Sequence, residues 1–186
     1  IRSLSTVGIL QSRQGAGTFV SEVKESPTLD SSPLRMLSAL HGFSSEEMFE
    51  ARLALEMSIA GLAAERATSE QMTLMAEEIT GMYASLAEPE QYLVHDMKFH
   101  QTVAAASDNR ILTALMNMVA TILYDSRSKT VKRAKDLKQS AEQHHNIYRA
   151  MREHSPEAAR KAMRDHLVKT QKAQALEERE DSDSGK

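Results

Sequence analysis

The sequence predicts an all-α fold, an antiparallel bundle of six to seven helices preceded by a short β-hairpin. From residue 34 onward, apolar residues recur at the three- and four-residue spacing of amphipathic helices. The chain of 186 residues has only seven Gly and four Pro, and aromatic residues make up 4% of it. These are too few turn residues and strand-forming residues for a sheet-rich fold.

Composition also excludes several functional classes. The chain has no Cys, so disulfides, iron–sulfur clusters, Cys-type zinc sites and thiol catalysis are excluded. Its net charge of −3 gives no general reason to expect nucleic-acid binding. No apolar run is long enough to span a bilayer. Any metal site must therefore be built from His and carboxylate residues.

The first 20 residues differ from the rest of the chain. Two short strands flank a turn that contains Gly15 and Gly17, which predicts a β-hairpin. An isolated hairpin is only marginally stable, so we expect this piece to end a domain whose beginning is missing. The predicted organisation is a domain remnant at 1–20, a Pro/Ser-rich linker at 21–33, a helical domain at 34–176 and a disordered acidic tail at 177–186.

Capping signals divide the helical domain into seven predicted helices. Ser44 and Glu47 have the spacing of a capping box, Thr68 and Asn109 are further N-caps, and Pro156 begins the last helix. The predicted helices cover residues 34–41, 44–66, 68–86, 89–107, 109–124, 129–153 and 155–176.

Two charged residues lie at the centre of an apolar helical arc. Arg52 and Glu56 are one turn apart and are flanked by apolar residues on both sides. They are either a buried ion pair that fixes helix packing, or an Arg that faces a cavity and holds an anionic ligand, oriented by Glu56. The helical wheel alone favours the ion pair.

Four potential metal ligands also lie on apolar faces. Asp96 and His100 are one turn apart on one helix, which is a common chelating arrangement. His144 and His166 lie equally far from the predicted turn at Ser155, so they reach the same height if the two helices fold back on each other. Such a set suits a borderline divalent ion. The alternative is a group of hydrogen-bonded core residues without metal.

These residues also resemble a known family. The segment from Leu4 to Val20, with Arg13-Gln-Gly15-Ala-Gly17-Thr-Phe-Val, is similar to the end of the winged-helix domain of GntR-family transcriptional regulators. The rest resembles the all-helical FCD effector domain of the FadR-type subfamily. The matching segments are Glu50–Glu56 with Ala63–Ala67, Asp96-Met-Lys-Phe-His100 with Ala105–Asn109, Glu142–Met151, and Pro156–Leu167. Gln143, between Glu142 and His144, departs from the family pattern.

The resemblance implies a set of functional residues. It assigns a divalent metal, with Zn, Ni and Mn as the main candidates, to Asp96, His100, His144 and His166. A small carboxylate effector would bind against that metal with help from Arg52, oriented by Glu56, and Asn109 and Arg127 are further candidates for the same cavity. The candidate DNA contacts in the winged-helix remnant are Arg2, Arg13, Gly15 and Gly17.

The implied protein is a cytoplasmic bacterial regulator and not an enzyme. A homodimer would bind a palindromic operator through two winged-helix domains, and the effector would change that binding. Residues 1–186 alone are expected to lack sequence-specific DNA binding. Two alternatives remain: a metal-dependent hydrolase of the HD-phosphohydrolase type, suggested by the adjacent His95 and Asp96, and a metal-free helical dimerisation module.

Overall fold

The computed structural model describes residues 10–13, 17–20, 44–134 and 136–184. Within these ranges it contains two strands and six α-helices, which confirms the predicted helical bundle. The predicted helix at 34–41 lies outside the described residues. The elements are β1 (Leu10–Arg13), β2 (Gly17–Val20), α3 (Ser45–Arg66), α4 (Ser69–Ala84), α5 (Pro89–Ala106), α6 (Arg110–Arg133), α7 (Leu137–Arg152) and α8 (Pro156–Ser184).

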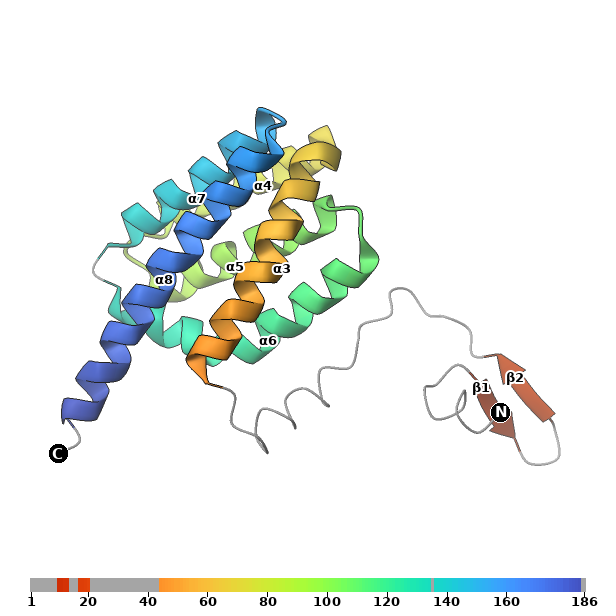
Figure 1. The fold of residues 1–186 in the computed structure, drawn as a ribbon, viewed down its shortest axis with the longest axis horizontal. Helices are drawn as coiled ribbons and strands as arrows, with labels where there is room; N and C mark the ends of the chain where they lie inside the picture. Colours follow the sequence, from red (N-terminus) through yellow and green to blue (C-terminus); the bar gives the residue numbers. More distant parts are fainter. Residues whose placement is uncertain (1–9, 14–16, 21–43, 135, 185–186) are drawn as a thin grey trace.

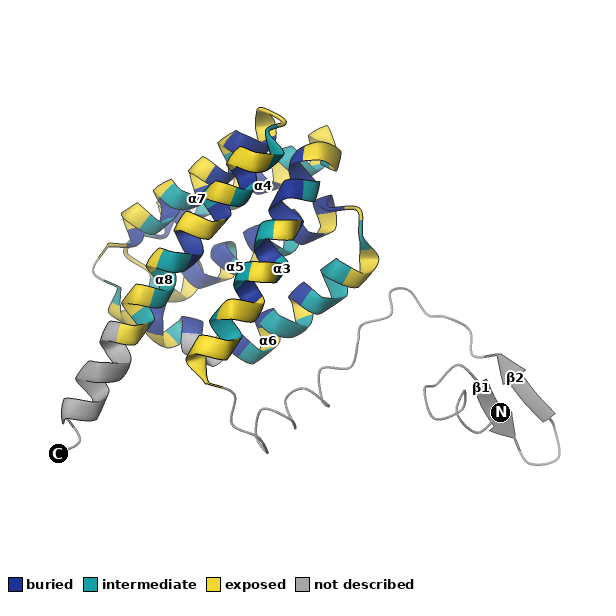
Figure 2. Cartoon of the chain, viewed as in Figure 1, coloured by how far each residue is buried: buried dark blue, intermediate teal, exposed yellow. Residues whose placement is uncertain are grey.

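The helices pack around a single core (Figure 1). Helix α8 lies between α3 and α7, while α5 packs against α3, α4 and α6. Each helix turns its buried residues inward and its exposed residues outward, as Figure 2 shows. Phe99 and Ile147 are among the largest fully buried side chains, and several methionines fill the space around them. No helix in the described part of the chain is long and apolar enough to cross a membrane.

Local sequence explains where most of the helices begin. Ser44 and Thr68 form complete capping boxes with Glu47 and Gln71, respectively, which satisfy the first free N–H groups of α3 and α4. The side-chain oxygen of Asn109 accepts hydrogen bonds from the first turn of α6. Strands β1 and β2 pair antiparallel, with Arg13 opposite Gly17, as expected for a hairpin.

The predicted boundary between the helices at 109–124 and 129–153 was wrong. Helix α6 continues to Arg133, because Arg127 and Thr130 face the interior on the same helical stripe. Helix α7 begins only at Leu137, where the Asp136 carboxylate accepts a hydrogen bond from Gln139 N at 2.9 Å. This N-cap was not predicted from the sequence.

The end of α8 also differs from the prediction. The helix continues beyond residue 176 to Ser184, through most of the acidic segment that was expected to be disordered. Between Glu157 and Ser184 there is no Gly or Pro, and Ala, Gln, Glu, Lys and Arg are strong helix formers. Local propensity therefore accounts for a helix that continues to Ser184.

Gly81 allows α4 and α5 to approach closely. A Cβ atom at position 81 would lie only 2.3 Å from Cε1 of the His95 ring. When Gly81→Ala is the single change, it should force the His95 ring away from Glu78. In the structure, His95 Nδ1 lies 2.7 Å from Glu78 Oε2. In a His95→Ala background, the same change should only add helix propensity and stabilise by about 1 kcal/mol. Urea unfolding of the double-mutant cycle measures this coupling, and equal effects in both backgrounds would contradict it.

Candidate metal centre and adjoining pocket

Three helices bring four potential metal ligands together in the core. Asp96 and His100 come from α5, His144 from α7 and His166 from α8. One ligand atom of each residue lies within 4.8 Å of the others, and all four residues are buried. The Nε2 atom of His144 is 3.0 Å from Asp96 Oδ1 and 3.3 Å from His100 Nε2. The positions predicted from the helical wheel therefore meet at one point.

The fold positions these side chains in two ways. The spacing of one turn places Asp96 and His100 on the same face of α5. The turn at Ser155 folds α8 back on α7, so the rings of His144 and His166 lie with their centroids 4.3 Å apart. Phe99 packs edge-on against the His144 ring at a centroid distance of 5.1 Å, which restricts that ring on its apolar side.

In each imidazole, the Nδ1 atom contacts a group that lies outside the four-residue cluster. His100 Nδ1 lies 2.8 Å from Glu56 Oε2, and His144 Nδ1 lies 2.8 Å from the Ser140 carbonyl oxygen. His166 Nδ1 lies 3.2 Å from Gln143 Oε1. In metal sites such outer contacts fix the tautomer and orient the ring. Here they leave all three Nε2 atoms for the centre of the cluster.

The donor set fits a divalent metal ion. Three imidazole nitrogens and a carboxylate oxygen suit zinc, nickel or manganese. His166 Nε2 is fully buried and has no hydrogen-bond partner among the described residues. Such an orphaned acceptor is costly in a core, but a bound cation would satisfy it.

Two buried carboxylates stay ionised beside the histidines. Burial alone would raise the pKa of Asp96, but the Arg127 guanidinium, and after it the contact with His144, hold that pKa well below its usual range. Burial likewise opposes ionisation of Glu56, but Arg52 and His100 lower its pKa. Both carboxylates therefore bring a full negative charge to the centre.

Two of the imidazoles, those of His100 and His166, favour in contrast the neutral form that binds metal. Burial lowers the pKa of His100, although the nearby Glu56 carboxylate opposes this effect. Burial also holds the pKa of His166 well below its usual range, and repulsion from His144 and His100 adds to the shift. A neutral ring with a free Nε2 is ready to accept a metal ion without first losing a proton.

Two buried arginines complete the charge arrangement. Arg52 Nε contacts Glu56 Oε1 at 2.8 Å, so the predicted pair is present and buried. Arg127 Nη2 contacts Asp96 Oδ2 at 2.6 Å. Arg52 Nη2 and Arg127 Nη1 are buried without a hydrogen-bond partner in the described part of the chain. Each guanidinium thus holds one carboxylate and has a further donor unused.

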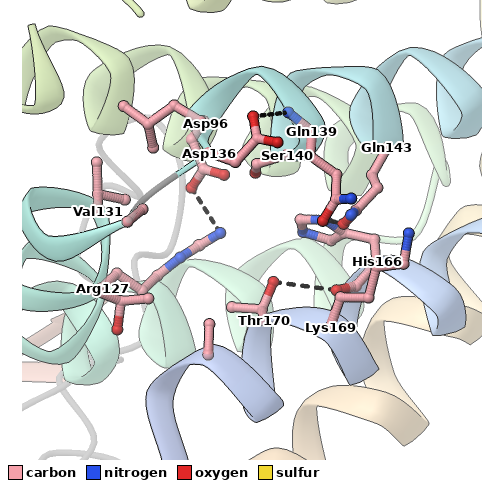
Figure 3. A pocket seen from close by; sticks show the side chains of 14 residues that line it. Asp96, Arg127, Val131, Asp136, Gln139, Ser140, Gln143, His166, Lys169 and Thr170 are labelled. Carbon is pink, nitrogen blue, oxygen red and sulfur yellow. Dashed lines mark hydrogen bonds and ion pairs between the residues drawn. The ribbon is translucent and has the colours of Figure 1, made fainter. Parts of the chain in front are cut away.

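A pocket opens beside the cluster between α6, α7 and α8 (Figure 3). Its volume is about 120 Å³. Asp96, Arg127 and His166 form part of its wall, together with Gln143 and Lys169, whereas His100 and His144 do not line it. One metal ligand from α8 and the carboxylate from α5 are therefore accessible from this side.

The other three predicted effector residues, Arg52, Glu56 and Asn109, do not line this pocket. Arg52 and Glu56 lie behind the cluster on α3 and do not line the pocket. Asn109 caps α6 with its side-chain oxygen and does not line the pocket either. Of the predicted DNA contacts, Arg2 and Gly15 lie outside the described residues, and Arg13 and Gly17 are described only as hairpin backbone.

Sequence reasoning missed three residues around the cluster. Ser140 precedes His144 by one helical turn, so its carbonyl oxygen is the expected partner of that ring. Gln143 was noted only as a departure from the family pattern, and Lys169 was not noted at all. Gln143 is on α7 and reaches His166 only through the packing of α7 on α8, so helical spacing within one segment does not reveal it. Lys169 follows His166 by three residues on α8, so the helical spacing of that segment could have indicated it.

Two further histidines, His95 and His154, make local contacts away from the cluster. His95 turns away from the cluster and contacts Glu78 Oε2 on α4 at 2.7 Å, so it does not form a joint site with Asp96. His154, in the turn before α8, contacts the Ala64 carbonyl oxygen at 3.0 Å. His41 lies outside the described residues. The arrangement expected of an HD-type hydrolase is therefore not formed by His95.

Comparison with known proteins identifies the family. The FCD domain family matches residues 47–169. The chain belongs to the GntR-family transcriptional regulators that carry an FCD domain. The GntR structure from Streptococcus agalactiae is 30% identical with a TM-score of 0.66, covering 92% of this chain and 78% of that chain. The predicted family and helical fold are confirmed.

Two curated relatives are also transcriptional regulators. LutR of Bacillus subtilis is 28% identical over 173 residues, which cover 90% of this chain and 78% of LutR. The putative L-lactate dehydrogenase operon regulatory protein of Escherichia coli is 32% identical over 177 residues, which cover 90% of this chain and 66% of that protein. The relatives are regulators and not enzymes, which agrees with the predicted absence of catalytic activity.

The buried histidines predict how the stability of the metal-free protein depends on pH. The pKa of His166 is lowered in the folded state, whereas a His in the unfolded chain titrates near ~6.5. As the pH falls from about 7 to about 5, the unfolded state gains protons that the folded state excludes, so the free energy of unfolding should fall. His166→Leu should make this fall shallower, by up to ~1.4 kcal/mol per pH unit.

Urea unfolding of chelator-treated protein at several pH values measures this effect. An equal slope for wild type and His166→Leu would contradict the assignment of a neutral, desolvated His166.

Proposed function

We propose that this chain is the effector-sensing part of a metal-dependent transcriptional regulator. The helical domain holds a divalent metal at Asp96, His100, His144 and His166, and a small carboxylate binds against that metal. The observation that carries the proposal is the convergence of these four buried residues, with an orphaned Nε2 atom on His166. When bound, the metal supplies open coordination positions for an anionic ligand.

The charge balance of the core supports an anionic effector. The two buried arginines, Arg52 and Arg127, are offset by Glu56 and Asp96. A divalent cation adds two positive charges to this balanced group, in a region where charges are poorly screened. A carboxylate ligand would compensate part of that charge and would find Arg127 Nη1 beside it.

The size of the pocket and the names of the relatives narrow the chemical class. A volume of about 120 Å³ suits a small organic acid better than a large one. One relative is named for the L-lactate dehydrogenase operon, and L-lactate is a short hydroxycarboxylate. We therefore take short carboxylates and hydroxycarboxylates as the first candidates.

The effector acts by changing the placement of DNA-binding domains. In the complete protein, a homodimer would present two winged-helix domains to an operator in the cytoplasm. The effector alters DNA affinity only if it binds the two domain arrangements with different affinity. The hairpin β1–β2 resembles only the end of such a module, so we expect no operator-specific gel shift from residues 1–186.

The metal ligands can be tested with two adjacent histidines of α7. His144→Ala should abolish stoichiometric zinc binding, because it removes a central ligand. The matched control His145→Ala should retain zinc, because His145 is exposed on the outer face of the same helix. Metal analysis of untagged protein, with thermal unfolding before and after chelation, measures both. Bound zinc at 100 times its Kd should stabilise by about 2.7 kcal/mol.

The metal proposal would be overturned if wild-type protein contains no stoichiometric zinc, nickel or manganese and if chelator leaves its thermal stability unchanged. That result would favour a metal-free dimerisation module instead.

The role of Arg127 can be tested by a change that keeps its charge. A single ammonium of Lys cannot contact Asp96 and an effector carboxylate with two separate nitrogens, as a guanidinium can. Arg127→Lys should therefore weaken binding of a small carboxylate to the zinc-loaded protein by about tenfold or more, while zinc remains bound. Isothermal titration with L-lactate, glycolate and acetate measures this loss, and unchanged carboxylate affinity would argue against a contact.

A further inference from the structure

The three histidines of the cluster differ in what holds them. His100 has a carboxylate partner, Glu56, and His144 has a backbone carbonyl oxygen, that of Ser140. His166 has the neutral amide of Gln143 at 3.2 Å. Of these three histidines, only His166 lines the pocket, and Gln143 lines it too. The one histidine of the cluster that faces the pocket is therefore also the one held by an uncharged side chain.

The orientation of the Gln143 amide follows from the role of His166. A His that binds metal through Nε2 carries its proton on Nδ1, so Nδ1–H must donate to Gln143. The acceptor on Gln143 is the oxygen Oε1, as the contact shows. The amide nitrogen, which can only donate, is then left for the pocket. Figure 3 shows Gln143 and His166 side by side on the pocket wall.

We propose that Gln143 joins the two halves of the site, holding His166 through Oε1 and donating from its amide nitrogen to the carboxylate of the bound effector. The inference rests on the proposed function, because it needs both a metal and an anionic effector. It makes Gln143 a positioning residue for the metal and a specificity residue for the effector. Binding of either ligand orders the same amide, so each should raise the affinity for the other.

The choice of Gln over Glu has a physical reason. A Glu at position 143 would hold His166 at least as firmly, because a carboxylate strengthens a ligating imidazole. It would also place a negative charge in the pocket and lose the N–H donor. A neutral amide is the side chain that supports the metal ligand and still accepts an anion nearby.

Two substitutions separate these roles. In Gln143→Glu, zinc affinity should rise or stay equal, while affinity for the carboxylate should fall by about tenfold or more. In Gln143→Ala, zinc affinity should fall by about tenfold to a hundredfold, and carboxylate affinity should fall as well. A residue with a merely structural role would change both affinities in the same direction in both variants.

Gln139→Glu is the matched control. Gln139 lines the same pocket from the same helix, α7, but in the described part of the chain no hydrogen bond joins it to His166, whose Nδ1 contacts Gln143. Its substitution adds the same charge to the pocket, so it should leave zinc affinity unchanged. A rise in zinc affinity that equals that of Gln143→Glu would mean that charge in the pocket, and not contact with His166, is responsible.

The experiment measures zinc affinity by competition with a chelating dye. It then measures binding of L-lactate, glycolate and acetate to the zinc-loaded protein by calorimetry. If Gln143→Glu binds the carboxylates as tightly as wild type does, the proposed role of Gln143 is overturned, but the proposed function is not. The same holds if zinc affinity and carboxylate affinity change in parallel in Gln143→Glu and Gln143→Ala. A wild type that binds no zinc, or none of the three acids, overturns the proposed function and this inference with it.

Discussion

The bundle depends on pairing the charges that it buries. Arg52, Glu56, Asp96 and Arg127 are all nearly inaccessible to solvent, and an unpaired charge at such depth is strongly destabilising. Glu56 contacts both Arg52 on its own helix and His100 on α5, while Asp96 contacts Arg127 on α6 and His144 on α7. The pairs leave little freedom for α3, α5, α6 and α7 to shift along one another.

This arrangement gives a physical basis for sensing. A cluster of this kind stabilises one set of helix positions only while its charges remain balanced. Entry of a cation or an anion changes that balance at a point where several helices meet. Helix α6 is well placed to respond, because it supplies Arg127 to the cluster and also forms part of the pocket wall. The same polar contacts that hold the fold together thus connect it to ligand binding.

Sequence patterns predicted most of the helical framework. Capping boxes at Ser44 and Thr68 and the Asn109 cap are local interactions within a few residues, so they are visible in the sequence. The boundary at Asp136 was missed because α6 continues on the strength of buried Arg127, a tertiary effect that overrides the local signals. The extension of α8 was missed for the opposite reason, since an acidic composition was given more weight than helix propensity.

The sequence by itself determined the four ligand candidates of the centre, because helical periodicity shows which polar residues lie on an apolar face. It also determined the Arg52–Glu56 pair, which is one turn of a single helix. Helix packing sets which groups contact the imidazoles from outside and which groups face the pocket. Glu56 and His100, or Gln143 and His166, lie on different helices, so their contact depends on how those helices pack. Packing therefore separated Arg52, behind the cluster, from Arg127, which lines the pocket.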